Sequence, residues 1–382
     1  MLNGDLRDLS TPSAVQEYLK DTVFASHTVT ALSGGLCNFT FRLHLVAQHQ
    51  GHSTYVLKYA APYVAFSAGT MPFTPERQNF EAGALRLVEK LQPGDGIVTA
   101  PVVHHLDDVA HVMIIDDCGE DTRTLKQSMI DGLVSPAMAE EIGCALGRFI
   151  GRIHSWTKDP SVDLSLFETN DEAKEISGFI SYGRLTSTLT GKDDIPALSD
   201  PPIDISQTDL QVISDLAAVR IQAINTTTET FTHGDFWPGN IMVSLRTDPE
   251  GGISPKLEKL YVLDWEATKT GLRGLDLGQF CAEIHLLRRF HANCEEPASV
   301  MLESFLRTYG QNQDVDVALA RTALTHVGAH LVAWGPRVKW GGREETRAIV
   351  KEGADLLAKG AFASEEWLQS QLIGPLLQSS NE

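Results

Sequence analysis

The chain has 382 residues, a formal net charge of -19 at pH 7 and a hydrophobic content of 42%. This length exceeds that of an average domain, about 150 residues, so we expect two core-forming lobes. The ordinary hydrophobic content excludes a mostly disordered chain. The strong negative charge disfavours binding to nucleic acids or to anionic membrane surfaces, and it favours neutral or cationic partners.

The sequence predicts a soluble, cytoplasmic protein. It lacks the run of about 18 apolar residues that a transmembrane helix requires, and its beginning lacks the apolar core of a signal peptide. The five cysteines are scattered without CxxC spacing. We therefore expect free thiols, with no disulfide framework and no zinc site.

The sequence of residues 1–115 predicts a small lobe that is built on antiparallel strands. Thr11 before Pro12 predicts the start of a helix that runs to about Lys20, because a hydroxyl caps free N–H groups and proline is tolerated at the first helical position. Alternating apolar residues predict two hairpins. Between them, apolar residues recur every three to four positions, which predicts a helix with one apolar face. The hairpins cover residues 39–60 and 101–115, and the helix covers residues 76–91. A hinge is expected at residues 116–121.

The rest of the chain, residues 122–382, predicts a larger and mainly helical lobe. Ser135 is the candidate cap of a buried helix over residues 136–156, in which His154 is expected to be structural. A helical insertion is expected at about residues 158–230, because a plain connection is rarely so long. Two strands, residues 241–245 and 260–263, precede a helical end. The fold class is therefore α+β.

The most informative segment is His-Gly-Asp-Phe-Trp-Pro-Gly-Asn, residues 233–240, which is followed by an apolar strand and Asp264-Trp265-Glu266. Phosphoryl transfer requires an acidic residue that orients the attacking hydroxyl, and oxygen ligands for magnesium. Asp235 fits the first role, and Asn240 and Asp264 fit the second. Taken singly, each of these residues also fits a turn or a strand end, but their combination favours the chemical interpretation.

Phosphate binding also requires a cation, and Lys58 lies inside the apolar strand at residues 55–59. A purely structural lysine is unusual in such a place. Glu81, on the helix that follows, is a candidate partner for Lys58. The alternative for Glu81 is a solvated residue on the helix surface.

In this order, these motifs resemble the aminoglycoside phosphotransferase and choline kinase-like superfamily of small-molecule kinases, over about residues 32–280. The resemblance implies a two-lobed, protein kinase-like fold, with a small antiparallel-sheet lobe and a larger helical lobe. It implies ATP and Mg²⁺ as cofactors and Asp235 as the catalytic base. It also implies Asn240 and Asp264 as magnesium ligands, and Lys58 on the ATP phosphates, held by Glu81.

The resemblance extends to weaker motifs. The segment Ser33-Gly34-Gly35-Leu36-Cys37-Asn38-Phe39 looks like the family's phosphate-covering turn, in which Gly34, Gly35 and Asn38 would face the nucleotide; the alternative is an ordinary hairpin turn. Backbone groups near Asp116 and Cys118 would bind adenine. Glu266 is a possible auxiliary residue for metal or substrate orientation, with a solvated role as the alternative.

Three further positions are expected to support the catalytic loop. Asp276 resembles the family's acidic residue that braces this loop, and His233 is expected to position it. Trp237 stands where relatives often have histidine, so we expect it to pack rather than to take part in the reaction.

The predicted reaction is the phosphorylation of a small molecule's hydroxyl group. Acceptors implied by the family include aminoglycosides, choline or ethanolamine, methylthioribose, and other sugars or amino alcohols. An acidic stretch between residues 91 and 122 would suit a cationic acceptor, although a merely solvated surface is favoured. Trp334 and Trp340 are candidates for an aromatic wall, but packing is favoured for both. The alternatives are a nucleotide-binding pseudokinase or interaction module, and a protein kinase acting on Ser or Thr.

Overall fold

The computed structural model describes residues 8–33, 35, 37–67, 69–91, 96–156, 159–246 and 255–378. The chain forms two compact units. The first unit comprises Met1–Gln92, Ala100–Asp121 and Leu263–Ala267, and the second comprises Pro93–Thr99, Thr122–Val262 and Thr268–Glu382. The mixed composition of sheet and helix confirms the predicted α+β class.

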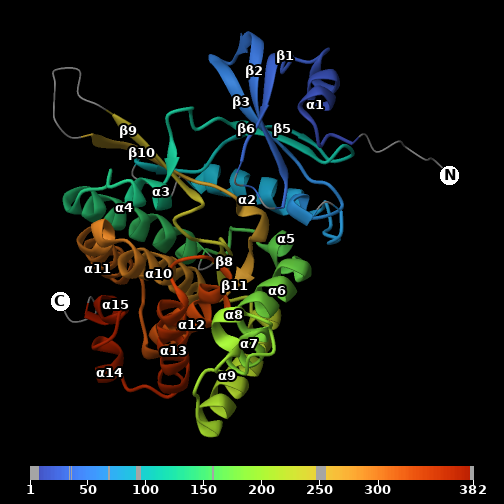
Figure 1. Cartoon of the computed structure of the whole chain (residues 1–382). Coiled ribbons are helices and arrows are strands. Elements are labelled where there is room, and N and C mark those ends of the chain that lie inside the picture. Colours follow the sequence, from blue (N-terminus) through green and yellow to red (C-terminus); the bar gives the residue numbers. More distant parts are fainter. Residues whose placement is uncertain are drawn as a thin grey trace. The chain divides into compact units, whose positions relative to one another are not determined.

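The first unit contains a five-stranded antiparallel sheet in the order β1-β2-β3-β6-β5 (Figure 1). Its strands are β1 (Ser26–Ala31), β2 (Phe39–His49), β3 (His52–Tyr59), β5 (Val103–Asp107) and β6 (Val112–Asp116). Both predicted hairpins are confirmed. Gln50 and Gly51 join β2 to β3 with φ of 49° and 85°, which is the backbone that a two-residue hairpin turn requires.

Two helices accompany this sheet. The first, α1 (Pro12–Leu19), begins as predicted, because the Thr11 side chain accepts a hydrogen bond from the backbone N–H of Ala14. The second, α2 (Arg77–Leu91), contacts β5, β6 and the short helix η4 (Trp265–Ala267). Another short helix, η1 (Ala65–Ser67), precedes α2. The side of α2 that faces inward carries Glu81 together with Ala84, Leu85 and Val88, so a carboxylate is buried among apolar side chains.

The second unit contains two small sheets that frame the segment 233–240. A four-stranded sheet has the order β4-β10-β9-β7, and a two-stranded sheet pairs β11 with β8. Their strands are β4 (Val98–Thr99), β7 (Arg123–Thr124), β8 (Thr230–Thr232), β9 (Ile241–Arg246), β10 (Lys256–Val262) and β11 (Lys269–Gly271). The segment thus leaves β8 and enters β9, which pairs in antiparallel fashion with β10. These strands confirm the predicted pair at residues 241–245 and 260–263 with different bounds: β9 ends one residue later, and β10 begins four residues earlier and ends one residue earlier than predicted.

Helices make up most of the second unit (Figure 1). Between β7 and β8 they are α3 (Leu125–Ile130), α4 (Pro136–Ser155), α5 (Ser165–Glu168), α6 (Asp171–Gly178), the π-helical turn η3 (Phe179–Gly183), α7 (Leu185–Leu189), α8 (Pro196–Ser199) and α9 (Gln207–Thr226). After β11 they are α10 (Arg273–Phe290), η5 (Ala292–Cys294), α11 (Glu295–Gln311), α12 (Val317–Ala333), η6 (Gly335–Arg337), α13 (Arg343–Gly360), α14 (Glu365–Gln369) and α15 (Gly374–Gln378). None of the helices in the described ranges is long and apolar enough to cross a membrane.

The helix α4 anchors this unit. Ser135 caps it as predicted, by accepting a hydrogen bond from the backbone N–H of Met138. It packs closely on α11, because a Cβ atom added at Gly147 would lie 2.5 Å from the carbonyl oxygen of Phe305. His154, near its end, lies 3.0 Å from both the Tyr309 hydroxyl and the Asp276 carboxylate, which confirms its structural role.

Candidate active site

The segment 233–240 is held in place by a buried carboxylate. Asp276, in the first turn of α10, accepts hydrogen bonds from the backbone N–H groups of His233 and Gly234, each at 2.9 Å. Gly234 has φ of 83°, a left-handed conformation that favours glycine. Burial alone would favour a neutral Asp276, but its hydrogen bonds and the His154 ring hold its pKa below the ordinary value. The expected bracing role of Asp276 is confirmed.

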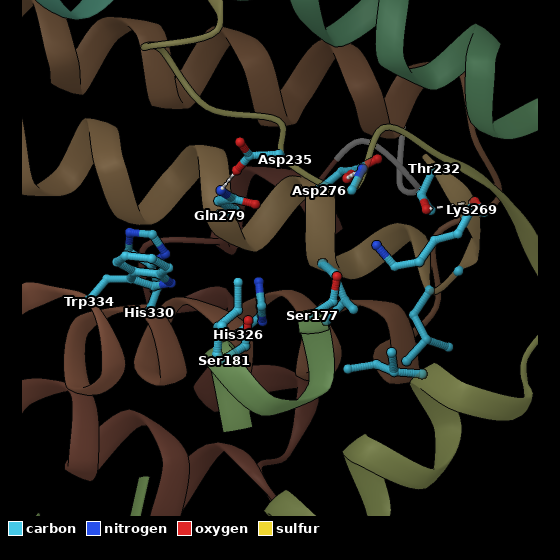
Figure 2. Close-up of a pocket in the computed structure, with 16 residues that line it drawn as sticks. Ser177, Ser181, Thr232, Asp235, Lys269, Asp276, Gln279, His326, His330 and Trp334 are labelled. Carbon is cyan, nitrogen blue, oxygen red and sulfur yellow. Dashed lines mark hydrogen bonds between the residues drawn. The ribbon is translucent and has the colours of Figure 1, made fainter. Parts of the chain in front are cut away.

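The carboxylate of Asp235 lies between two side-chain amides. Gln279 donates to its Oδ1 at 2.5 Å (Figure 2). Asn240 donates to its Oδ2 at 2.8 Å. The Asn240 amide nitrogen also donates to the backbone carbonyl of Asp235 at 3.1 Å. Because the nitrogen of Asn240 binds Asp235 twice, its amide oxygen is the atom that it can offer to a cation. The structure therefore brings Asp235 and Asn240 together.

Trp237 packs within the same loop, as expected. The Lys126 ammonium lies 5.1 Å from the centroid of this ring and 4.1 Å from that of Trp340. The backbone N–H of Lys126 donates to the carbonyl of Pro238 at 3.0 Å, so α3 supports the loop. A Cβ atom at Gly239 would lie 2.2 Å from the Trp237 ring, which explains the need for glycine there. The Trp340 ring thus contacts Lys126 of the same chain, which agrees with the packing role favoured for it.

In the first unit, Lys58 joins two carboxylates. Its ammonium lies 2.5 Å from Oε1 of Glu81 and 2.7 Å from Oδ1 of Asp264. Burial opposes the charge of Lys58, but attraction to Asp264 and Glu81 outweighs burial and raises its pKa above the ordinary value. The structure thus brings Lys58, Glu81 and Asp264 together.

Glu266 completes an acidic cluster in this unit. Oxygen atoms of Glu81, Asp264 and Glu266 all lie within 4.8 Å of one another. Burial and the neighbouring Asp264 raise the pKa of Glu266 to about 8, so a further positive charge would stabilise the cluster. Closely spaced carboxylate oxygens are the ligands that Mg²⁺ prefers, and the residues present therefore fit this ion.

Asn38, in the loop before β2, binds Glu266 through its side chain. Its amide nitrogen donates to Oε2 of Glu266 at 2.7 Å, and its amide oxygen accepts from Nε of Arg77 at 3.0 Å. Gly35 is exposed on the same segment, and a Cβ atom there would lie 3.3 Å from the carbonyl oxygen of Asn38. Gly34 lies outside the described residues. Asn38 therefore belongs to the acidic cluster through its side chain.

The predicted adenine-binding segment begins at Asp116, the last residue of β6. The Asp116 carboxylate accepts a hydrogen bond from the backbone N–H of Val102 at 2.9 Å and lies 2.6 Å from Nε2 of His104. Cys118 is half-buried and is not part of a disulfide. Between them, Asp117 accepts two hydrogen bonds from Arg42, at 2.7 and 2.9 Å, which fixes the backbone of the segment.

Three residues near these sites were not predicted from the sequence: Arg77, Gln279 and Lys269. Arg77 is 2% exposed and supports Asn38. Gln279 follows Asp276 by three positions, so both residues lie on one face of α10. This spacing could have indicated that Gln279 lies near the segment that Asp276 holds. No sequence pattern indicated the position of Lys269, because it depends on the pairing of β11 with the distant strand β8.

A pocket opens beside Asp235 in the second unit. Figure 2 shows Lys269, His326, His330 and Trp334 around it, together with Asp235 and Gln279. Apolar side chains of Ile180, Ile224, Leu272 and Leu275 form part of the lining, together with Ser177, Ser181, Thr232, Gly234, Gly271 and Asp276. Burial lowers the pKa of Lys269 to about 8 and the pKa of His326 to about 3. Trp334 therefore lines this pocket, whereas the sequence favoured a role in packing for this residue.

Comparison with known proteins gives a consistent picture. A model of the phosphotransferase enzyme family matches residues 28–319. The chain is 31% identical, over 85% of each chain, to the 4-hydroxytryptamine kinase of Psilocybe cubensis. It is 29% identical to the 4-hydroxytryptamine kinase of Psilocybe cyanescens, over 91% of this chain and 92% of that one.

A solved structure shares the fold. It is the amicoumacin kinase hAmiN in complex with AMP-PNP, Ca²⁺ and Ami. The TM-score is 0.51 at 13% sequence identity, and the match covers 90% of this chain and 92% of that chain.

Proposed function

Because the chain belongs to the phosphotransferase enzyme family and is a kinase that acts on small molecules, we propose that it transfers the γ-phosphoryl group of ATP to a phenolic hydroxyl of a hydroxyindole such as 4-hydroxytryptamine. One observation carries the reaction type: the Asp235 carboxylate is held by two amides at the edge of a pocket. A carboxylate fixed in this way can orient a hydroxyl group and accept its proton.

In the proposed reaction, Asp235 receives the proton of the acceptor hydroxyl. The acceptor oxygen forms a bond to the γ-phosphorus, while the bond from this phosphorus to the bridging oxygen of ADP breaks. Because Gln279 and Asn240 fix the carboxylate, the hydroxyl is aligned before transfer begins. The loop keeps this geometry through the hydrogen bonds to Asp276.

Asn240 and Asp264 are the proposed magnesium ligands, with Glu266 as an auxiliary. When bound, Mg²⁺ would neutralise charge on the phosphate oxygens. Lys58 would bind those phosphates, and Glu81 holds its ammonium in position. Kinases of this family use ATP, and the first unit supplies the residues proposed to bind it.

The proposed contacts of the nucleotide continue along the first unit. Gly34 and Gly35 would offer backbone N–H groups to the phosphates, next to Asn38. Backbone groups near Asp116 and Cys118 would bind adenine. The ion pair of Arg42 with Asp117 supports this segment, because it holds the chain between those two residues.

Two observations favour a hydroxyindole over a polycationic aminoglycoside. The relatives with about 30% identity are named for 4-hydroxytryptamine. The pocket lining combines the Trp334 and His330 rings with four aliphatic side chains, a surface suited to a flat aromatic ring. Its carboxylates are Asp235, assigned to the hydroxyl, and Asp276, which binds the loop backbone, so several ammonium groups would find poor compensation.

The test measures ADP release from Mg-ATP with 4-hydroxytryptamine, choline, methylthioribose and an aminoglycoside as acceptors. We expect release with the hydroxyindole and a fall of about 10² to 10⁴ in Asp235→Asn. The matched control is Asp355→Asn, at a position where the side chain is 60% exposed, and it should behave like the wild type. Preference for another acceptor would overturn the assigned substrate, and turnover that survives Asp235→Asn would overturn the mechanism.

A further inference from the structure

His330 is a buried histidine that the reaction as described above does not use. It lies on α12 with 5% exposure, and its side chain lines the pocket beside Asp235 (Figure 2). The ring of Trp334, four residues later, lies next to it, with 6.4 Å between the two ring centroids and an interplanar angle of 31°. The two rings therefore form one wall of the pocket.

Glu283, on the neighbouring helix α10, holds one nitrogen of the His330 ring. Its Oε1 lies 2.8 Å from Nε2 of His330, and its Oε2 lies 3.1 Å from the ammonium of Lys126. Burial opposes the charge of Glu283, but the contacts with His330 and Lys126 outweigh burial and hold its pKa below the ordinary value. Because a carboxylate can only accept hydrogen bonds, Nε2 of His330 carries the proton in this contact.

The other ring nitrogen of His330, Nδ1, is left for the pocket. Over the described ranges, the hydrogen bond with Glu283 is the one that this ring makes. The buried side-chain atoms of these ranges that lack both a partner and solvent contact lie on Glu81, Ser128, Arg220 and Gln313, so Nδ1 of His330 keeps an opening. In the neutral ring with its proton on Nε2, Nδ1 is a hydrogen-bond acceptor. The pocket wall therefore presents an acceptor whose direction Glu283 fixes.

A neutral N–H group of a flat ring suits this acceptor better than an ammonium group does. Lys126 already balances the charge of Glu283. The guanidinium of Arg184 lies 6.0 Å from the centroid of the Trp334 ring. An ammonium group of the substrate would therefore be a further cation in this part of the pocket, whereas a ring N–H donates a hydrogen bond without adding charge.

We propose that His330, oriented by Glu283, makes the pocket specific for acceptors that carry a ring N–H, as a hydroxyindole does. The inference rests on the proposed function, because it concerns the acceptor whose hydroxyl Asp235 orients. The hydroxyl at Asp235 and the N–H at His330 would fix the ring at two points. An analogue without the N–H would leave Nδ1 unpaired inside the pocket, which weakens its binding. Glu283 is a positioning residue in this arrangement.

The first test compares 4-hydroxyindole with 4-hydroxybenzofuran, in which an oxygen atom replaces the ring N–H. ADP release at pH 8 gives kcat/KM for both acceptors, and we expect the wild type to prefer the hydroxyindole about 10-fold to 100-fold. His330→Met should abolish this preference. His330→Gln should keep part of it, because an amide can donate to Glu283 and accept from the ring N–H. Equal kcat/KM values for the two acceptors in the wild type would overturn the proposal without any variant.

Glu283→Gln separates the orientation of His330 from its packing. It keeps the shape of the side chain but adds an N–H donor, so it no longer requires the proton on Nε2. We expect the preference for the N–H acceptor to fall about 10-fold, with little change for 4-hydroxybenzofuran. The control is His285→Met, because His285 is another buried histidine, 2.8 Å from Glu352, and lies outside this pocket. Equal losses for both acceptors in His330→Met and Glu283→Gln would identify a structural role and overturn the proposal.

The second test needs no turnover. Indole and benzofuran carry no hydroxyl group, so calorimetry can measure their binding in the presence of Mg-ADP. The wild type and His330→Gln should bind indole more tightly than benzofuran, by about 10-fold in the wild type, and His330→Met should not. Equal affinities for the two ligands in all three proteins would overturn the inference. An indole preference that depends on His330, without phosphorylation of any hydroxyindole, would instead reject the proposed function alone.

Discussion

Gln279 donates a hydrogen bond to Oδ1 of Asp235 at 2.5 Å, while Asn240 occupies Oδ2. Gln279 and Asp276 lie three residues apart on α10, so one turn of helix holds both the side chain of Asp235 and the backbone of its loop. The orientation of the carboxylate therefore depends on α10 as much as on the segment 233–240 itself.

Replacing Gln279 by leucine should lower kcat about 10-fold, because a hydrogen bond to a charged group contributes about 1.5 to 3 kcal/mol and part of it is regained from water. The KM for ATP should change little. Steady-state kinetics check both values. Gln211→Leu is the control, because this exposed glutamine also donates to an aspartate, Asp215, at 2.9 Å. Equal kcat values for wild type and Gln279→Leu would contradict the proposed positioning.

Glu81→Gln should raise the KM for ATP and lower kcat/KM about 10-fold, because Lys58 loses one of its two carboxylate partners. The measurement is initial rate against ATP concentration. Glu89→Gln, an exposed position on the same helix, should leave the kinetics unchanged. A normal KM for ATP in Glu81→Gln would show that Glu81 does not hold Lys58 for the nucleotide.

Gly239→Ala should reduce activity, since the added methyl group would lie 2.2 Å from the Trp237 ring and overpacking costs about 1 to 3 kcal/mol. The ring would have to leave its contact with Lys126. Gly239→Ala combined with Trp237→Leu should recover activity toward that of Trp237→Leu alone. Additive losses in the double variant would place the effect in the backbone rather than in the ring.

His326 should make the protein less stable in mild acid. Burial lowers its pKa from 6.5 to about 3, with repulsion from His330, Arg220 and Lys269 adding to the shift. The folded state thus binds fewer protons than the unfolded state below pH 6.5, so this contribution to stability is present above pH 6.5 and lost as the pH falls toward 3.

Between pH 7 and pH 5 this single group should cost about 2 kcal/mol of unfolding free energy. Urea unfolding at the two pH values measures the difference. His326→Asn keeps a polar group facing the Tyr182 hydroxyl, 3.0 Å from Nδ1, and should remove most of this pH dependence. His27→Asn, at an exposed histidine, should keep it. An unchanged pH dependence in His326→Asn would contradict the assignment.

Local sequence patterns predicted the hairpins, the capped helices α1 and α4, and the strands β9 and β10 that follow the segment 233–240. Each depends on residues close together in the chain, such as Thr11 with Ala14 or Ser135 with Met138. The spacing of Asp235 and Asn240 also predicted their proximity, because only four residues separate them.

The pocket beside Asp235 was not predicted, because its walls come from distant segments. Lys269, Gln279 and Trp334 meet only after β11 pairs with β8 and α12 packs on α10. Asn38 illustrates the same limit: its side chain contacts Glu266 and Arg77, the first of these 228 positions away. Such contacts leave no periodic signal in the sequence.

The most direct test of the central claim is ³¹P NMR of a reaction containing the full chain, Mg-ATP and 4-hydroxytryptamine. We predict a new phosphate monoester signal that grows as the γ-phosphate of ATP disappears, that requires the acceptor, and that is lost in Asp235→Asn. ATP that stays intact in the wild-type reaction, or an ester that forms equally fast in Asp235→Asn, would contradict the account.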